Sequence, residues 1–195
     1  MIILGIDQAR RSGWAVFKGA GIVASGFVYD TPGMVGVLDV VKAFADGDMT
    51  RVLVVFEDHS GIPLSAKARF ARGHAPQRNT ATILGIGAAR GRWETALDLA
   101  DHPERLRLSV EPQDWRARVL GLVPSASTER CKQAAGAYAS QLIARAVTDD
   151  NEAEAVCIAC WGSLDGVASL ERERMQRRMR DRIKRMAGKQ RGLPW

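Results

Sequence analysis

The chain has 195 residues, of which 46% are hydrophobic, so it is long enough to form a single domain with a full core. No uninterrupted apolar run reaches the roughly 18–20 residues that span a bilayer, and the N-terminus lacks the basic segment and cleavage site of a signal peptide. The three cysteines are too few for a disulfide framework. We therefore expect a protein of a reducing, cytoplasmic compartment that does not enter a membrane.

The positive charge is concentrated at the C-terminus. Residues 171–195 contain ten Lys and Arg against three Asp and Glu, a net charge of +7, whereas residues 1–170 contain 18 against 19, a net charge of −1. A concentrated basic segment is typical of a polyanion partner such as nucleic acid. A tail that only improves solubility is the alternative.

Taken in chain order, the sequence predicts strands and helices that alternate. Apolar runs predict five strands, at residues 1–7, 13–17, 21–29, 51–56 and 105–110. Helices are predicted from Thr31, over 79–100, from Pro112, over 127–147 and over 149–161. Thr31 suits the N-cap of its helix and Pro32 the first helical position. This order predicts an α/β fold with a mixed sheet of about five strands and helices on both faces.

The segment between the fourth strand and the second helix is long and basic. A loop of the length of residues 58–78 in a compact domain is usually functional or disordered. In the helix that follows, Gly85, Gly87 and Gly91 predict close packing against a neighbouring element. Near the C-terminus, Cys157 and Cys160 have the spacing of a metal-binding pair but no second pair, so we interpret them as core thiols.

Two of the predicted strands end in an acidic residue. Asp7 ends IILGID and Glu57 ends VLVVFE. If these strands are neighbours in the sheet, both carboxylates lie at one edge, where they repel each other unless one is protonated. A divalent cation removes this conflict, because Mg²⁺ and Mn²⁺ prefer carboxylate and other oxygen ligands.

A third group of acids begins the helix TDDNEAEAVCIACW. With Asp149 as N-cap, Asp150 and Glu154 lie one turn apart on one face, and Asn151 lies three residues before Glu154. Taken alone, these acids need only complement the helix dipole and form a capping box through Glu152. Together with the two acids at strand ends, they predict a metal site built from several elements.

Five segments, in this order, carry a resemblance to a known family: GIDQARRSGWAV, VVFEDHSG, LGIGAARG, VEPQDWRARVLG and DDNEAEAVCIA. Over residues 1–162 the chain resembles the RuvC-type Holliday junction resolvases of the RNase H-like superfamily. The resemblance implies an RNase H-like nuclease domain at 1–162 and leaves 163–195 as a basic helical tail. It also implies an endonuclease that cuts four-way or other branched DNA.

The resemblance assigns roles to the acids. Such nucleases hold two Mg²⁺ or Mn²⁺ ions that flank the scissile phosphate. By position, Asp7 would bridge the two ions, Glu57 would bind one, and Glu154 would stand where the family has its last acid, usually Asp. Asn151 stands where the family has another Asp, so either Asn151 or the neighbouring Asp150 would be the fourth ligand. Lys132 would lie near the phosphate.

The resemblance also implies DNA contacts beyond the metal site. Arg10 and Arg11 follow the first acid and would meet backbone phosphates. Phe70 in the long loop would stack on an unpaired base, or alternatively would only pin the loop to the body of the domain. The remaining predicted DNA-binding residues are all basic: Lys67, Arg69, Arg72, Arg78, Arg130, Lys132, Arg177 and Arg178. Because Met175 and Met179 recur at helical spacing, the tail has a second interpretation, in which it packs on the body or on a partner subunit.

We expect a homodimer, because two symmetric nicks in a four-way junction require two active sites. The compact size, with a divergent loop and tail, would suit a bacteriophage-encoded enzyme. Two alternatives stay open. One is an RNase H-like nuclease that acts on other branched or RNA-containing substrates, and the other is a non-catalytic DNA-binding protein with a degenerate metal site.

Overall fold

A computed structural model of the protein describes residues 1–58, 80–172, 175–176 and 178–180. Its centre is one five-stranded sheet with the order β3-β2-β1-β4-β5. The strands are β1 (Ile2–Asp7), β2 (Ser12–Lys18), β3 (Gly21–Val28), β4 (Val52–Glu57) and β5 (Arg107–Val110). The first three form an antiparallel meander, while β1, β4 and β5 are parallel to one another. The predicted mixed sheet is therefore confirmed.

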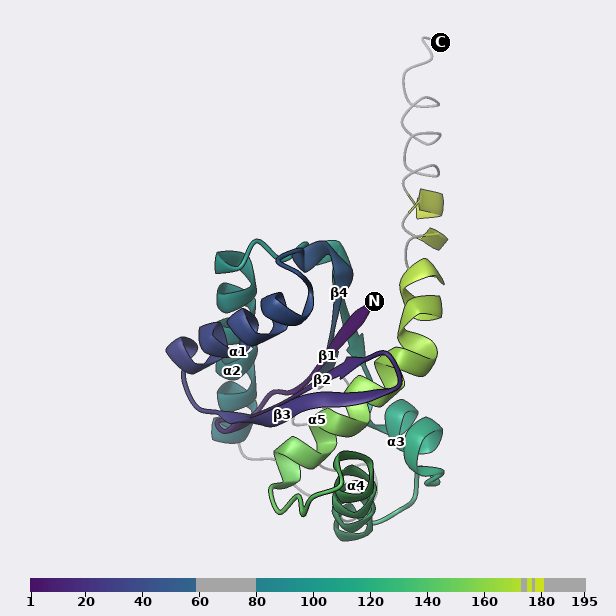
Figure 1. Ribbon diagram of the computed structural model, residues 1–195. Helices are drawn as coiled ribbons and strands as arrows, with labels where there is room; N and C mark the ends of the chain where they lie inside the picture. Colours follow the sequence, from purple (N-terminus) through teal and green to yellow (C-terminus); the bar gives the residue numbers. More distant parts are fainter. Residues whose placement is uncertain (59–79, 173–174, 177, 181–195) are drawn as a thin grey trace.

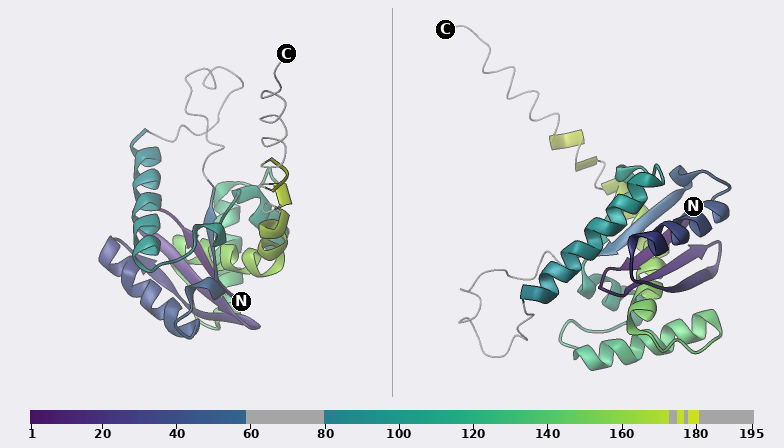
Figure 2. Two further views of the ribbon diagram at one scale, coloured as in Figure 1. Left: turned by 90° about the horizontal axis from the view of Figure 1, so that it is seen from above. Right: turned by 90° about the vertical axis from the view of Figure 1, so that its left-hand side faces the viewer.

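Helices cover both faces of this sheet (Figure 1). They are α1 (Thr31–Phe44), α2 (Thr80–Leu99), α3 (Pro112–Leu120), α4 (Thr128–Ile143) and α5 (Asp150–Trp161). On one face α1 and α2 lie side by side (Figure 2) and bury a core around Phe56 and Trp93. On the other face α3, α4 and α5 bury a second core around Leu53 and Trp115. The prediction of helices on both faces is also confirmed.

The helix α5 lies directly on the sheet because two strands carry glycine beneath it. A Cβ at Gly5 would lie 2.4 Å from Ala159 N, and one at Gly13 would lie 1.9 Å from Asn151 O. By length and composition the helical stretch Asp150–Arg172 could cross a membrane, with a mean hydropathy of 1.2, but 61% of that window is buried in the protein. Its apolar surface is therefore explained by its position as the core helix.

Most predicted boundaries lie within one residue of those observed, and three differences have a clear local cause. The N-cap of α1 is Asp30, whose side chain accepts a hydrogen bond from Gly33 N at 2.9 Å; Thr31 is already helical. The strand predicted from residue 105 begins at Arg107, because Glu104–Leu106 forms a 3₁₀ turn. The helix predicted to reach 147 ends at Ile143, where Ala144 adopts a left-handed φ of 55°.

The predicted N-cap of α5 is confirmed, since Asp149 accepts from Glu152 N. At α4, Ser127 is the N-cap and accepts from Arg130 N. Cys157 and Cys160 are buried core thiols on α5, and burial raises the pKa of Cys160 to about 11. Both thiols are therefore protonated at neutral pH and pack as apolar side chains of the core.

Candidate active site

The carboxyl ends of β1 and β4 bring two acids together. The strands are parallel neighbours with Ile6 opposite Phe56, so Asp7 and Glu57 occupy the next position on each. All other residues of both strands are buried apolar side chains or glycine, and this makes the support rigid. Asp7 and Glu57 are themselves only 4% and 3% exposed. Two carboxylates are thus held at one edge of the sheet, as their positions after apolar runs predicted.

A third acid reaches the same place from α5. Glu154 lies one turn into the helix, and its side chain is 12% exposed. Carboxylate oxygens of Asp7, Glu57 and Glu154 all lie within 4.8 Å of one another. We refer to these three residues as the carboxylate cluster. It joins side chains from two strands and a helix that are separated by about fifty and one hundred positions in the sequence.

Two residues of α3 contact the carboxylate cluster, and the sequence analysis did not assign them a role. The indole N–H of buried Trp115 donates to Glu57 Oε1 at 3.1 Å. Arg116 Nη2 lies 3.8 Å from Glu57 Oε1 and 3.6 Å from Glu154 Oε1. The segment DWRAR could have pointed to them. A Trp that becomes buried needs a hydrogen-bond partner for its indole N–H, and here the Trp stands next to an arginine that can pair with an acid.

The donor set fits a divalent cation. When all three carboxylates are ionised they carry a charge of −3, and Arg116 compensates one of these charges, so the excess of negative charge favours divalent cations. Oxygen-only ligands at this spacing suit Mg²⁺ or Mn²⁺ rather than a softer metal. Beside Asp7, the buried Gln8 donates its amide to the Glu57 carbonyl, and among the described residues its Oε1 has no hydrogen-bond partner.

The two candidates for a fourth ligand have other contacts. Asp150 Oδ2 lies 2.7 Å from Lys132 Nζ, and this hydrogen bond raises the pKa of Lys132. Asn151 donates its side-chain amide to Arg11 O at 2.7 Å, which ties the start of α5 to the loop after β1. Neither contact involves the carboxylate cluster, and the identity of a fourth ligand stays a prediction.

The predicted DNA-binding residues are distributed around this end of the sheet and on the tail. Arg10, Arg130 and Arg178 are exposed, and the side chain of Lys132 is 41% exposed. Arg11 forms an ion pair with Asp149 at 2.8 Å. The other predicted contacts lie outside the described residues: Lys67, Arg69, Phe70, Arg72, Arg78 and Arg177.

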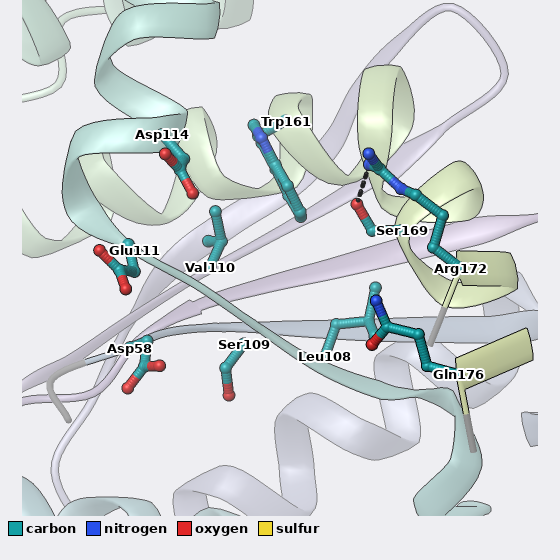
Figure 3. Close-up of a pocket in the computed structure, with 10 residues that line it drawn as sticks. All are labelled: Asp58, Leu108, Ser109, Val110, Glu111, Asp114, Trp161, Ser169, Arg172 and Gln176. Atoms are coloured by element: carbon teal, nitrogen blue, oxygen red, sulfur yellow. Dashed lines mark hydrogen bonds between the residues drawn. The ribbon is translucent and has the colours of Figure 1, made fainter. Parts of the chain in front are cut away.

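A cavity of about 410 Å³ lies beside β5, between α3 and the helix that continues from α5 (Figure 3). Asp58, Glu111 and Asp114 line one side of it, and Arg172, which donates to Ser169 Oγ at 3.0 Å, lines the other. None of its lining residues belongs to the carboxylate cluster.

The antiparallel meander followed by parallel strands, with helices on both faces of the sheet, is consistent with the RNase H-like fold. Among proteins of this fold, the chain has the architecture of RuvC, as its sequence resemblance predicted.

Two solved structures of Thermus thermophilus RuvC carry this similarity. The chain matches one at a TM-score of 0.56 and 17% identity, over 87% of its own length and 98% of that protein. It matches the other, RuvC in complex with a Holliday junction substrate, at 0.56 and 14% identity, over 87% and 97%. No model of a known protein family matches the sequence, and no curated protein does. The similarity is therefore one of fold.

Proposed function

We propose that this protein is a divalent-metal-dependent endonuclease that cuts four-way or other branched DNA. The observation that carries the proposal is the carboxylate cluster, which two neighbouring strands and α5 bring together in a RuvC fold. One of the two RuvC structures is a complex with a Holliday junction, the substrate class that we extend to this chain. The protein would act in the cytoplasm of a bacterial or phage-infected cell.

Asp7, Glu57 and Glu154 would hold two Mg²⁺ or Mn²⁺ ions, with Asp150 or Asn151 completing the set. When bound, such a pair activates a water molecule and stabilises the oxygen that leaves the phosphorus. The chain itself holds Glu57 in position through Trp115, and Arg116 places a permanent positive charge beside two of the acids. Lys132, protonated at neutral pH, contributes a second positive charge near Glu154.

We also propose a homodimer that uses α2. A Cβ at Gly85, Gly87 or Gly91 would meet no described atom within 4 Å, so the neighbouring element against which these glycines are predicted to pack is not found among the described residues. On the same helix Leu84 is 68% exposed. Small residues and an exposed Leu on one helix are suited to close contact with a second copy. Sedimentation of Gly87→Arg, expected as a folded monomer, tests this assignment.

DNA binding by the tail is part of the proposal. Met175 and Met179 are 65% and 66% exposed, so they do not pack closely on the described part of the body, and Figure 1 shows the last described residues leading away from it. Their neighbours Arg178 and Arg180 are exposed as well. An extended basic helix can follow a DNA backbone, and the salt dependence of binding reports such contacts.

The test is cleavage of synthetic substrates in Mg²⁺ and in Mn²⁺. The panel comprises a four-way junction, a nicked duplex, a flapped duplex, an RNA–DNA hybrid and an intact duplex. We expect paired nicks on opposing strands of the junction and none in the intact duplex. Cleavage of the hybrid alone would favour a ribonuclease, and tight junction binding without cleavage would favour a non-catalytic DNA-binding protein.

A further inference from the structure

Two exposed aromatic side chains and a stacked arginine lie together at the edge strand β3, beside the start of α5. Phe27 and Tyr29 are 44% and 57% exposed, and their ring centroids are 5.9 Å apart at an interplanar angle of 79°. The guanidinium carbon of Arg11 lies 3.6 Å from the Phe27 centroid and 5.9 Å from that of Tyr29. We call Arg11, Phe27 and Tyr29 the aromatic platform.

The charge of Arg11 already has a partner inside the protein. Its Nη2 lies 2.8 Å from Asp149 Oδ2, while Oδ1 of the same carboxylate caps α5. The Arg11 carbonyl accepts from the Asn151 amide, so both ends of the residue are tied to the helix start. A guanidinium that is oriented and charge-compensated in this way is a poor phosphate ligand but a good stacking surface. The aromatic platform therefore suits an uncharged planar group.

The sheet register places the aromatic platform close to the carboxylate cluster. Asp7 is paired with Gly13, and Gly13 with Phe27, so Asp7 and Phe27 project from the same face. Two strand spacings separate them, which is about 10 Å. At about 3.4 Å per nucleotide along a stacked strand, that distance corresponds to roughly three nucleotides. Between them the backbone of α5 at Asn151 lies over Gly13, so a DNA strand held at the carboxylate cluster would pass around the start of α5 for its neighbouring bases to reach Phe27.

We propose that the aromatic platform binds an unpaired nucleobase next to the branch point of the DNA. The inference deepens the proposed function and rests on it. Branch points offer unstacked bases that an intact duplex does not, and stacking on aromatic and guanidinium surfaces accepts any base. The aromatic platform would then contribute preference for branched DNA over duplex without reading its sequence.

The test uses a junction that carries one unpaired 2-aminopurine at its branch point, with EDTA present so that no strand is cut. Wild type is compared with Phe27→Ala, with Phe27→Leu, which keeps apolar area without a π-face, and with Val23→Ala. Val23 is a matched control, since it lies on the same strand with the same exposure of 44%. Affinity, probe fluorescence, far-UV circular dichroism and the mass in solution are measured for each.

We expect Phe27→Ala to weaken junction binding roughly 5- to 150-fold, the range for loss of one stacked base, while duplex binding and Val23→Ala stay unchanged. Binding should quench the probe in wild type and not in Phe27→Ala, with Phe27→Leu in between. If folded Phe27→Ala and Phe27→Leu both bind the junction with wild-type affinity and quench the probe as strongly as wild type does, the inference is overturned. A loss of dimer mass in these variants would also overturn it, by assigning the surface to a second copy. Wild type that binds no junction would instead reject the proposed function.

Discussion

The position of Arg116 makes a prediction that distinguishes a metal site from an ordinary buried ion pair. Its guanidinium lies 3.8 Å from Glu57 and 3.6 Å from Glu154, and its side chain is 26% exposed. In the metal-free protein this positive charge offsets repulsion within the carboxylate cluster. When a cation binds to the same carboxylates, the same charge repels it. Substitution by the neutral Arg116→Gln should therefore affect stability and metal affinity in opposite directions.

The magnitude follows from the distances. At about 3.7 Å a pair of unit charges attracts by about 4 kcal/mol at an effective dielectric constant of about 20, and by about 1 kcal/mol in water. Because Arg116 loses hydration and is partly exposed, we expect a net loss of about 1–3 kcal/mol in the free energy of unfolding. For a chain of this size that corresponds to a Tm lower by roughly 3–10 °C without metal. Mn²⁺ affinity should rise about 5- to 30-fold, equivalent to about 1–2 kcal/mol.

Thermal unfolding in EDTA and calorimetric titration with Mn²⁺ measure the two effects. Arg118→Gln is the matched control, because Arg118 lies on the same helix, pairs with Asp165 at 2.8 Å and is 55% exposed. It should leave Mn²⁺ affinity unchanged. If Arg116→Gln changes stability without raising Mn²⁺ affinity, the carboxylates that it contacts are not the metal ligands.

Three further predictions concern the fold, its pH dependence and the tail. Gly13→Ala should destabilise the protein by about 3 kcal/mol or more, because the new Cβ would lie 1.9 Å from Asn151 O. Gly21→Ala is the control, since a Cβ there meets nothing within 4 Å, and it should change stability by less than about 0.5 kcal/mol. Urea denaturation measures both. Burial lowers the pKa of His102, whose Nε2 lies 3.0 Å from Val52 O. As the pH falls, this histidine is therefore protonated in the unfolded chain at a higher pH than in the folded protein. The free energy of unfolding should fall as the pH drops below about 6.5. In His102→Gln that part of the pH dependence should be missing from Tm measured between pH 7.5 and 5; an unchanged profile would contradict the assignment. Removal of residues 171–195 should weaken junction binding and flatten its dependence on salt by about 0.9 per lost phosphate contact, whereas an unchanged slope would mean that the tail does not contact DNA.

The strand-end acids were predictable because their signal is local. A continuous apolar run indicates a strand buried on both faces, and an acid at its end stands out against that background. That Asp7 and Glu57 would be neighbours required only that the two strands pair in parallel, and they do. The N-cap of α5 was predictable for a similar reason, since Asp149 directly precedes an acidic first turn and then a continuous apolar helical run.

The remaining features depend on contacts between distant segments. In the sequence, Arg116 is one of several arginines on a short charged helix. Its contact with Glu57 could not be predicted without knowing that α3 packs next to the end of β4. In the sequence, Gly13 only marks the start of a strand. That a side chain at this position would clash with the backbone of α5 becomes apparent only from the packing of the two elements. The α1 cap was assigned to Thr31 rather than Asp30 because both residue types suit an N-cap, and only backbone geometry separates them.

Cleavage of a four-way junction by wild type and by Asp7→Asn tests the central claim most directly. Asp7 is buried at the end of the central strand and belongs to the carboxylate cluster, while the residue change removes charge without changing shape. We predict paired nicks by wild type in Mg²⁺ or Mn²⁺, none in EDTA, and none by Asp7→Asn, which should still bind the junction as tightly. Cleavage by Asp7→Asn at the wild-type rate, or wild type that binds the junction and cuts nothing in either metal, would contradict the account.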